Sequence, residues 1–407
     1  MILVFNTGSS TLKFGCFDAA TLTTTATGVI DWSSREGGAI VRDGSGTEVL
    51  RSTESARGHH AAVGEALGIL AAARFVPDDG RGSFISAVGH RVVHGGTRFR
   101  ASVAIDTEVK EAIRELSPLA PLHNPPALDV IDATEAALGA LPQVVVFDTA
   151  YFADLPARAF LYPLPYAWYS EWGIRRFGFH GISHEYCSNR VAELDPTNPP
   201  SAIIICHLGN GCSATAVRNG RPVATTMGFT PLEGLMMGTR AGSFDPGVLI
   251  HLLREKGRGV DELFDALNEG SGLLGVSGVS GDYREVERAA GRGFGRARLA
   301  LDLYSDRVRS AIGSLAVTLG SVDALVFTGG VGENSPALRV AACDGLECLG
   351  IYLDAEKNLQ TGADREIGAS RSKTKVWVIH TREDLLIARE TCRITTPHLP
   401  VTTSNPT

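Results

Sequence analysis

Six short apolar runs recur along the chain, each of a length typical of a β-strand. They are ILVF at residues 2–5, AVGHRVV at 87–93, QVVVF at 143–147, AIIIC at 202–206, DALVF at 323–327 and KVWVI at 375–379. Several are followed by glycine-rich or polar turns, and longer segments of helical character lie between them. The pattern therefore predicts a mixed α/β protein.

The clearest helical pattern spans residues 296–319 and leads directly into the run at 323–327. Its apolar residues recur at steps of three to five positions and leave the charges on another face. They are Leu299, Leu303, Val308, Ile312, Leu315 and Leu319. Residues 194–200 form a cluster of helix breakers, residues 33–46 are a glycine-rich polar insertion, and we expect the tail from residue 395 to be frayed.

The apolar start of the chain is repeated about half a chain later. Residues 2–10, ILVFNTGSS, align with residues 203–211, IIICHLGNG, at a constant offset of 201 (209 − 8). Both contain four apolar residues, a polar residue, one spacer and a small-residue turn, and both precede a second strand-like run. A duplicated fold of two similar lobes predicts this repeat. The alternative is that strand-then-glycine turns are simply common in α/β proteins.

Composition narrows the class of protein. A length of 407 residues exceeds what one core usually organises, and 44% hydrophobic with 20% charged residues is typical of globular domains. The net charge of −7, with scattered Lys and Arg, argues against nucleic-acid or anionic-membrane partners. We find no signal peptide or membrane span, and the seven cysteines form no CxxC pair, so we expect a cytoplasmic protein.

Three turns have the residues that a phosphate site needs. The first, Asn6 to Lys13, combines glycine, hydroxyl groups and a lysine, and the strand alternation places Thr11 and Lys13 on one side. The second turn is HLGNG at 207–211. Both of these turns are equally consistent with plain hairpins that bind no ligand. The third, VFTGGVGENS at 326–335, links a strand to a helix that can begin at Pro336. None is a P-loop or Rossmann fingerprint.

Four charged residues lie where catalytic groups are common. Asp148 ends a strand-like run, Arg91 lies within another, and His180 and Arg240 come from small-residue loops. Taken singly, each has an ordinary alternative: a helix cap or salt bridge for Asp148, a surface ion pair for either arginine, and a structural role for His180.

Together these segments resemble the acetate kinase family, from Asn6 to about residue 389. The motifs that carry the resemblance are NTGSSTLK, GHRVVHGG, PLHNPPA, FDTAYF, RRFGFHGISH, HLGNG, MGFTPLEGLMMGTR, SGDYREV, FTGGVGENS and TREDLLIARE. The resemblance implies the duplicated two-lobed α/β fold of actin and hexokinase (ribonuclease H-like), with an active-site cleft between the lobes. It places an N-terminal lobe at 1–150, joined by 384–407, and a nucleotide-binding lobe at 151–383.

The same resemblance implies a role for individual residues. The catalytic set is Asp148, His180, Arg240 and Arg91; the metal residues are Asn6 and Glu383; the phosphate turn adds Ser9 and Thr11. The pocket for the substrate methyl group comprises Val93, Leu122, Phe179 and Pro231, with Arg91 holding the carboxylate. The nucleotide set is Lys13, His207, Leu208, Gly209, Asn210, Gly211, Asp282, Tyr283, Arg284, Gly330, Val331, Gly332, Glu333 and Asn334.

The implied reaction is reversible transfer of the γ-phosphoryl group of ATP to acetate, giving acetyl phosphate and ADP. Mg²⁺ is the expected cofactor, with Mn²⁺ as an alternative, and the expected assembly is a homodimer. Acetate is ionised at neutral pH, so direct in-line transfer without a strong base is favoured over a phosphoenzyme. Propionate kinase is a sister activity that sequence alone does not separate. An ATP-hydrolysing switch of the same fold is the rival from another class.

The chain departs from the usual family pattern at several positions. Thr7 and Gly330 stand where alanine is usual, and Thr11 replaces a serine while keeping the hydroxyl group. Arg382 replaces the usual asparagine beside Glu383 and brings a cation close to a presumed metal carboxylate. Ala241 and Ser243 also differ, and none of these changes removes a residue assigned to the chemistry.

Overall fold

The computed structural model describes residues 1–8, 10–32, 37–53, 57–76, 84–362 and 364–396. The chain divides into two compact units. Unit 1 comprises Met1–Ala150 and the segment that begins at Arg382, and unit 2 comprises Tyr151–Thr381. Unit 1 is therefore assembled from both ends of the chain, whereas unit 2 is continuous.

Unit 1 is built on an eight-stranded sheet with the order β5-β4-β3-β2-β1-β6-β8-β7. Its strands are β1 (Ile2–Thr7), β2 (Thr11–Phe17), β3 (Thr24–Asp31), β4 (Gly38–Asp43), β5 (Glu48–Ser52), β6 (Ala87–Val92), β7 (Val103–Ala104) and β8 (Gln143–Phe147). β1, β6 and β8 are mutually parallel, while β1 through β5 pair antiparallel. The carboxyl ends of β1, β6 and β8 therefore meet at one edge.

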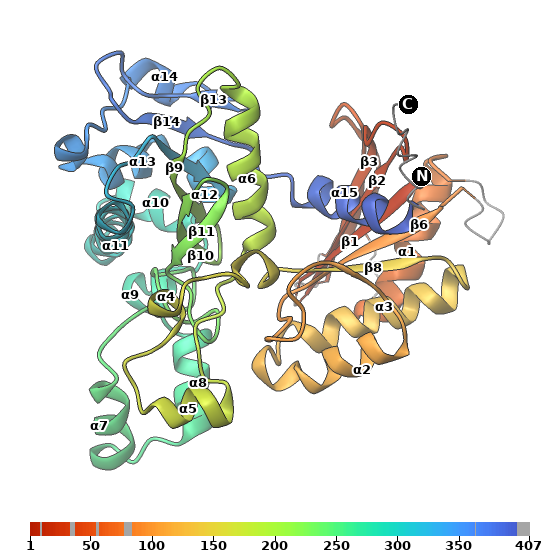
Figure 1. The fold of residues 1–407 in the computed structure, drawn as a ribbon, viewed down its shortest axis with the longest axis horizontal. Coiled ribbons are helices and arrows are strands. Elements are labelled where there is room, and N and C mark those ends of the chain that lie inside the picture. The colour runs from red at the N-terminus through yellow and green to blue at the C-terminus, as the bar shows by residue number, and fades with distance from the viewer. Residues whose placement is uncertain (9, 33–36, 54–56, 77–83, 363, 397–407) are drawn as a thin grey trace, which may run out of the picture. The chain divides into compact units, whose positions relative to one another are not determined.

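Helices cover both faces of this sheet (Figure 1). They are α1 (His59–Ala72), α2 (Thr107–Glu115), the 3₁₀ turn η1 (Ser117–Leu119), α3 (Asn124–Leu138) and α15 (Glu383–Thr395). α15 packs on β1, β6 and β8, and Gly89 permits the approach, because a Cβ there would lie 2.3 Å from the Thr391 hydroxyl oxygen. On the opposite face α1 and α3 enclose a core that includes Leu3, Phe5 and Val130.

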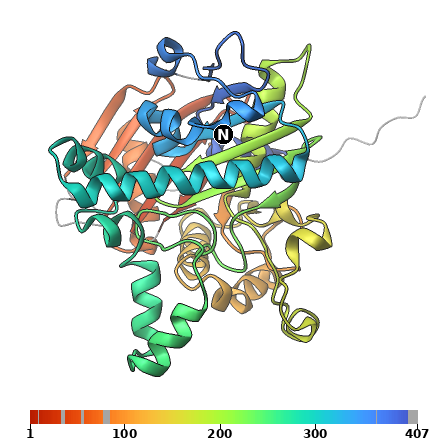
Figure 2. The same cartoon turned by 90° about the vertical axis from the view of Figure 1, so that its left-hand side faces the viewer.

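Unit 2 contains a six-stranded sheet with the order β11-β10-β9-β12-β14-β13. Its strands are β9 (Ala202–Leu208), β10 (Cys212–Arg218), β11 (Arg221–Thr225), β12 (Ala324–Thr328), β13 (Arg365–Glu366) and β14 (Lys375–Val378). α11 (Gly295–Leu319) lies across this sheet (Figure 2) and contacts β9, β10 and β11, and α6 (Gly181–Leu194) contacts β9.

Shorter helices complete unit 2. They are α4 (Ala157–Phe160), α5 (Tyr166–Trp172), α7 (Gly247–Glu255), α8 (Val260–Asn268), α9 (Gly272–Ser277), α10 (Tyr283–Gly291), α12 (Gly329–Asn334), α13 (Pro336–Cys343), α14 (Ala355–Leu359) and the 3₁₀ turn η3 (Leu346–Leu349). A further 3₁₀ turn, η2 (Ala150–Phe152), lies where the chain passes from one unit to the next.

The two units share a strand arrangement, which accounts for the repeat in the sequence. The order β3-β2-β1-β6-β8 in unit 1 matches β11-β10-β9-β12-β14 in unit 2, with the same sequence of antiparallel and parallel pairings. In β1–β2 the last pair is Thr7 with Leu12, and in β9–β10 it is Leu208 with Cys212. The second turn is therefore one residue shorter than the first, and the duplication is confirmed.

All six apolar runs form strands, and the predicted long helix is confirmed, but two details of the pattern were wrong. Leu299 is 57% exposed, because the buried stripe of α11 follows Ala297, Ala300, Tyr304 and Val308 instead. The glycine-rich segment 33–46 contains strand β4, and its residues 33–36 lie outside the described residues. The helix expected to begin at Pro336 is confirmed as α13, and the short helix α12 that precedes it was not predicted. The tail from residue 397 also lies outside the described residues.

The described residues contain no helix long and apolar enough to cross a membrane. All seven cysteines are free thiols. Burial raises the pKa of Cys16 to about 12, so that thiol is a packed apolar group rather than a reactive one.

The turn from β12 into α12 requires glycine at its first position. Gly329 has a φ of +77°, and a Cβ there would lie 2.8 Å from the carbonyl oxygen of Leu208 in the neighbouring strand. At Gly330 a Cβ would meet nothing within 4 Å. Adjacent glycines in one helix therefore differ in what they tolerate.

We predict that Gly329→Ala lowers the free energy of unfolding by about 2 kcal/mol or more, through backbone strain and the contact with Leu208. Gly330→Ala is the matched control and should be neutral or stabilising by about 0.5–1 kcal/mol, because alanine favours a helix more than glycine does. Urea unfolding followed by circular dichroism measures both, and equal destabilisation of the two variants would contradict the assignment.

Candidate active site

Four of the predicted site residues lie at one edge of the unit 1 sheet. Asn6 is in β1, Arg91 is near the end of β6, and Asp148 directly follows β8. Glu383 is the first residue of α15. Because β1, β6 and β8 are adjacent and parallel, their carboxyl ends bring these side chains together, which is where open α/β sheets place ligand sites.

The four side chains form a continuous hydrogen-bonded series. Arg91 Nη2 lies 2.5 Å from Asp148 Oδ2, and Arg91 Nε lies 3.2 Å from both oxygens of the same carboxylate. Arg91 Nη1 donates to Asn6 Oδ1 at 3.1 Å, and Asn6 Nδ2 donates to Glu383 Oε2 at 3.0 Å. Two predictions were made for Asp148, a salt-bridge partner and a catalytic-site residue. Its geometry is compatible with both.

The charges of this series are tightly coupled. Asp148 is 1% exposed, so its carboxylate depends on the guanidinium of Arg91 for compensation. Burial acts to lower the pKa of Arg91, yet the carboxylates of Asp148 and Glu383 raise that pKa above its ordinary value. Two carboxylates and one guanidinium leave a net negative charge, and such a charge attracts cations.

Two buried hydrogen-bonded pairs, not predicted from the sequence, support the loops around this edge. Asn124 accepts from the backbone N–H of His94 at 3.1 Å and donates to the His94 carbonyl at 3.0 Å. Thr149 Oγ1 accepts from the N–H of Gly95 at 2.9 Å. They fix the segments that directly follow Arg91 and Asp148.

The opening turn is ordered by its own backbone and by a histidine. The N–H of Gly8 donates to the Thr11 carbonyl at 2.8 Å, and His59 Nε2 lies 2.8 Å from the Gly8 carbonyl oxygen. Lys13 is exposed and pairs across the strands with Asn6. Ser9, predicted as part of this turn, lies outside the described residues.

Arg382 is anchored to other partners than Glu383. Its Nη2 donates to Thr24 Oγ1 at 2.6 Å, and its Nε lies 3.6 Å from Asp384 Oδ1. The cation that replaces the family's usual asparagine is thus held by a hydroxyl group and a separate carboxylate.

In unit 2, His180 and His207 lie next to each other. Their rings are stacked with centroids 4.4 Å apart and planes inclined by 23°. His180 precedes α6 and has a left-handed backbone, with φ of 56°, an uncommon conformation for a residue other than glycine. His207 Nδ1 forms a hydrogen bond of 2.8 Å with Ser183 Oγ. A non-glycine residue held in this conformation is typical of functional sites.

A buried serine joins two histidines in this part of unit 2. Ser213 Oγ lies 2.9 Å from His180 Nδ1 and 2.7 Å from His184 Nε2. Burial, with a smaller contribution from His207, lowers the pKa of His184 well below its ordinary value, so His184 is neutral. Neither Ser213 nor His184 was among the predicted site residues, although HGISH places His184 one helical turn after His180.

Arg240 lies beside His180, with Gly211 between them. A Cβ at Gly211 would lie 3.0 Å from His180 Nε2 and 3.9 Å from Arg240 Nη1. Arg240 donates from Nη1 to the carbonyl oxygen of Pro231 at 3.1 Å, and burial lowers its pKa. Within the described residues no carboxylate forms an ion pair with Arg240. A desolvated cation whose acceptor is a neutral carbonyl is a candidate anion-binding group.

A pocket of about 680 Å³ gathers most of the predicted nucleotide residues of unit 2. Its lining comprises Gly209, Asn210, Gly281, Asp282, Tyr283, Arg284, Glu287, Gly330, Val331, Asn334 and Ser335. Asp282 caps α10 through the N–H of Arg284 at 2.8 Å. The volume lies in the range of ligand pockets. Gly281, Glu287 and Ser335 were not predicted.

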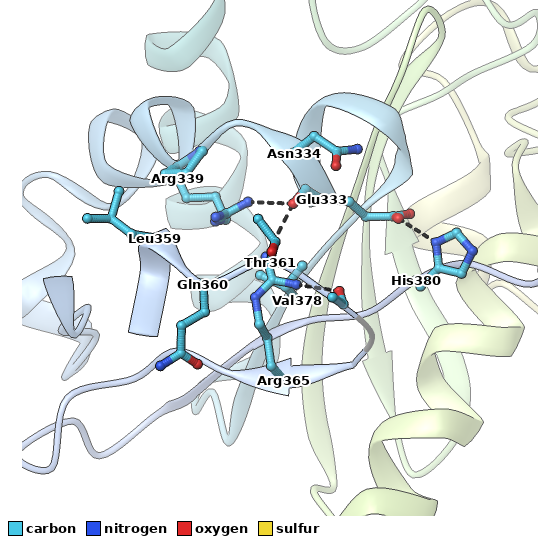
Figure 3. Close-up of a pocket in the computed structure, with 11 residues that line it drawn as sticks. Glu333, Asn334, Arg339, Leu359, Gln360, Thr361, Arg365, Val378 and His380 are labelled. Carbon is cyan, nitrogen blue, oxygen red and sulfur yellow. Dashed lines mark hydrogen bonds and ion pairs between the residues drawn. The ribbon is translucent and has the colours of Figure 1, made fainter. Parts of the chain in front are cut away.

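Glu333 belongs to a different pocket, of about 470 Å³, on which Figure 3 is centred. Its carboxylate accepts from the N–H of Gly329 at 3.0 Å and lies 2.6 Å from His380 Nδ1. Two arginines, Arg339 and Arg365, donate to its carbonyl oxygen at 3.0 Å and 3.4 Å. Glu333 thus stabilises the start of α12 and the segment beside it. Asn334 lines both pockets.

The remaining predicted residues are distributed over both units. Lys13, Val93 and Leu122 belong to unit 1, whereas Phe179, Pro231, His207, Leu208, Gly211 and Gly332 belong to unit 2. Val93 and Phe179 are buried, at 6% and 1% exposure, while Leu122 is 44% exposed. The described residues contain no group of three or more His, Cys, Asp or Glu arranged to hold a metal ion.

Comparison with known proteins accords with this geometry. The profile of the acetokinase family matches residues 1–389. An acetate kinase of Nostoc punctiforme is 48% identical over 402 residues, covering 97% of this chain and 99% of that protein. The crystal structure of Porphyromonas gingivalis acetate kinase has a TM-score of 0.87 at 39% identity, and a propionate kinase from Francisella tularensis has 0.87 at 36%; each alignment covers 97% of this chain and 99% of the other.

Two α/β units with one shared strand order, together with the likeness to solved acetate and propionate kinases, place this chain in the class of two-unit α/β kinases. Within that class, the chain belongs to the acetokinase family. It is accordingly a phosphotransferase, and its family uses ATP or ADP and, in general, a divalent metal ion.

Proposed function

We propose that this protein is an acetate kinase that transfers the γ-phosphoryl group of ATP reversibly to acetate, giving acetyl phosphate and ADP. The observation that carries the proposal is Arg240, a partly buried cation beside His180 that has no carboxylate ion-pair partner within the described residues. Nearby in unit 2 is a pocket of suitable size for a nucleotide, lined by Asn210, Asp282 and Asn334.

Phosphoryl transfer places its main demand on electrostatics. Negative charge accumulates on the three equatorial oxygens while the donor and acceptor oxygens lie in line. We assign Arg240 and His180 to those oxygens, because a desolvated guanidinium interacts more strongly with an anion than a hydrated one does. Gly211 leaves room for a ligand at both side chains.

In unit 1, Arg91 is assigned to the carboxylate of acetate or of acetyl phosphate. Its ion pair with Asp148 fixes the plane of the guanidinium and therefore the direction of its donors. Asp148 is 1% exposed and already neutralised, so it suits neither a nucleophile nor a general base. One acetate oxygen bonds to the γ-phosphorus as the bond from that phosphorus to the β–γ bridging oxygen breaks. The burial of Asp148 and its ion pair with Arg91 support direct transfer over a phosphoenzyme.

Mg²⁺, with Mn²⁺ as the alternative, fits the residues at the edge of the unit 1 sheet. Asn6 and Glu383 offer one amide oxygen and one carboxylate, the small donor set typical of an ion whose remaining ligands are water and nucleotide phosphates. When bound, such an ion screens the charge of the phosphates. Asn6 Nδ2 donates to Glu383 Oε2 at 3.0 Å, and this hydrogen bond keeps the amide and carboxylate oxygens of the two residues close together.

The acid preference is the finer part of the proposal. Val93, Leu122, Phe179 and Pro231 are assigned to the methyl group of acetate. A single methylene in an apolar pocket discriminates by only about 1–3 kcal/mol, so propionate kinase is the second candidate, and the Francisella tularensis structure supports keeping it. An ATPase switch is less consistent with the ordered Arg91 group, since hydrolysis needs no carboxylate site.

A homodimer is also part of the proposal. The helices α5, α7 and α8 lie at the same end of unit 2 (Figures 1 and 2), and each exposes large apolar side chains. The exposed fractions include 63% for Trp172, 52% for Ile250 and 73% for Val260. Side chains of this kind are typical of surfaces buried between subunits.

Seven free thiols fit a reducing compartment, and we place the enzyme in the cytoplasm.

The decisive experiment is the initial rate of ADP formation from MgATP with acetate, propionate, butyrate or no acceptor. We expect acetate to lead in kcat/KM by about tenfold or more, within the range of about 10–200-fold that one methylene can provide. A lead for propionate would assign the sister activity. ADP release that is independent of any acceptor would instead refute phosphoryl transfer to a carboxylate.

Arg91→Lys tests the acceptor site while keeping a positive charge beside the buried Asp148. Lysine cannot reproduce the paired N–H groups, so we expect kcat/KM for acetate to fall about 100-fold with the KM for ATP little changed. The control is Arg98→Lys. Arg98 is half-exposed, its Nη2 lies 2.6 Å from Glu108 Oε1, and it is not part of the hydrogen-bonded series of Arg91. Equal activity of the two variants would remove Arg91 from the site.

Ile250→Glu and Val260→Glu test the dimer. A carboxylate placed in an apolar interface is desolvated, so both variants should sediment as monomers under conditions in which the wild-type protein is a dimer. Val317→Glu is the control, since Val317 is 82% exposed on α11 and outside these helices. A monomeric wild-type protein in sedimentation equilibrium would rule the dimer out.

A further inference from the structure

The hydrogen bonds around Ser213 restrict where protons reside on two histidines. Ser213 Oγ contacts His180 Nδ1 at 2.9 Å and His184 Nε2 at 2.7 Å, and Ser213 is fully buried. A hydroxyl group has one proton to donate and can accept others. The placement of each proton therefore follows from which buried groups have a partner.

His184 determines the direction of the series. Its Nδ1 is buried and has no hydrogen-bond partner among the described residues. A proton on Nδ1 would be a buried donor without an acceptor, which costs more than a bare ring nitrogen in the same place. Because His184 is neutral, its single proton therefore belongs on Nε2, from which it donates to Ser213 Oγ.

The hydroxyl proton of Ser213 then has one acceptor in reach, Nδ1 of His180. If His180 donated from Nδ1 instead, both histidines would donate to the same oxygen and the buried hydroxyl proton would have no acceptor there. A neutral His180 that accepts at Nδ1 carries its proton on Nε2. This is the nitrogen that lies 3.0 Å from the Cβ position of Gly211, on the side where Arg240 also lies.

We propose that Ser213 and His184 are positioning residues that keep His180 neutral with its proton on Nε2, so that it donates a hydrogen bond to the transferring phosphoryl group. The opposite tautomer would present a lone pair to the phosphoryl oxygens and repel them. The inference rests on the proposed role of His180 in phosphoryl transfer. It adds to that role a buried relay, His184 to Ser213 to His180, which sets the direction of the donor.

The test is nitrogen-15 NMR of the full-length protein labelled at histidine, at neutral pH and without ligands. His180 should show a protonated Nε2 and an unprotonated Nδ1, and His184 the same pattern. Ser213→Ala should leave His180 as a mixture of tautomers and lower kcat at least about tenfold, with KM values little changed. Ser305→Ala, a buried serine bonded within α11, is the control and should change neither.

His184 provides a second variant should Ser213→Ala fold poorly. His184→Gln keeps an N–H donor for Ser213 and should preserve the Nε2 tautomer of His180, whereas His184→Leu should lose it. A cationic or Nδ1-protonated His180 in the wild-type protein would overturn the proposal, as would an unchanged tautomer and kcat in Ser213→Ala. Since the NMR pattern needs no turnover, it holds or fails independently of which acid is phosphorylated.

Discussion

The ion pair between Arg91 and Asp148 is the constraint on which unit 1 depends. A carboxylate with 1% exposure is costly unless a cation compensates it, and the guanidinium does so with three N–H to oxygen contacts. That requirement fixes β6 beside β8 at their carboxyl ends. A further donor of Arg91, Nη1, orients Asn6, and Asn6 in turn holds the first residue of α15. One buried charge pair thus organises a strand edge and a helix start.

Unit 2 uses the same strand order for the opposite electrostatic purpose. Here the partly buried cation, Arg240, donates to a carbonyl oxygen, and His180 and His207 are oriented by hydroxyl groups rather than by carboxylates. The edge of the unit 1 sheet therefore combines two carboxylates with one guanidinium, whereas Arg240 of unit 2 forms no ion pair with a carboxylate of the described residues. Duplication of a fold has thus given two strand edges of different charge.

The sequence predicted the strands well because long apolar runs leave few alternatives to a buried strand, as in residues 143–147 and 202–206. It predicted less where propensity opposes the structure: α12 contains three glycines in six residues, GGVGEN, and no local signal indicates a helix. Leu299 was misplaced because steps of three to five positions fit two neighbouring stripes of one helix.

The supporting residues of the site were beyond reach for another reason. His184 and Ser213 are 29 residues apart, and Gly95 and Thr149 are 54 apart, so their contacts exist only after the sheets have formed. Asn6, Arg91, Asp148 and Glu383, in contrast, were found through motifs, and the structure brings all four together. What motifs do not encode is the orientation of a proton or a carboxylate, such as the alignment of Glu333 with His380.

The discontinuity of unit 1 has a consequence for how the molecule is made. Synthesis completes unit 2 as one uninterrupted segment, ending at Thr381, before the first residue of α15 exists. The sheet of unit 1 must then wait, with one face uncovered, until the last helix emerges and packs on β1, β6 and β8. Because Glu383 is the first residue of that helix, the hydrogen bond that joins it to Asn6 closes only after all of unit 2 has been translated. This hydrogen bond therefore forms only after every strand of the described residues, β1 to β14, has been made.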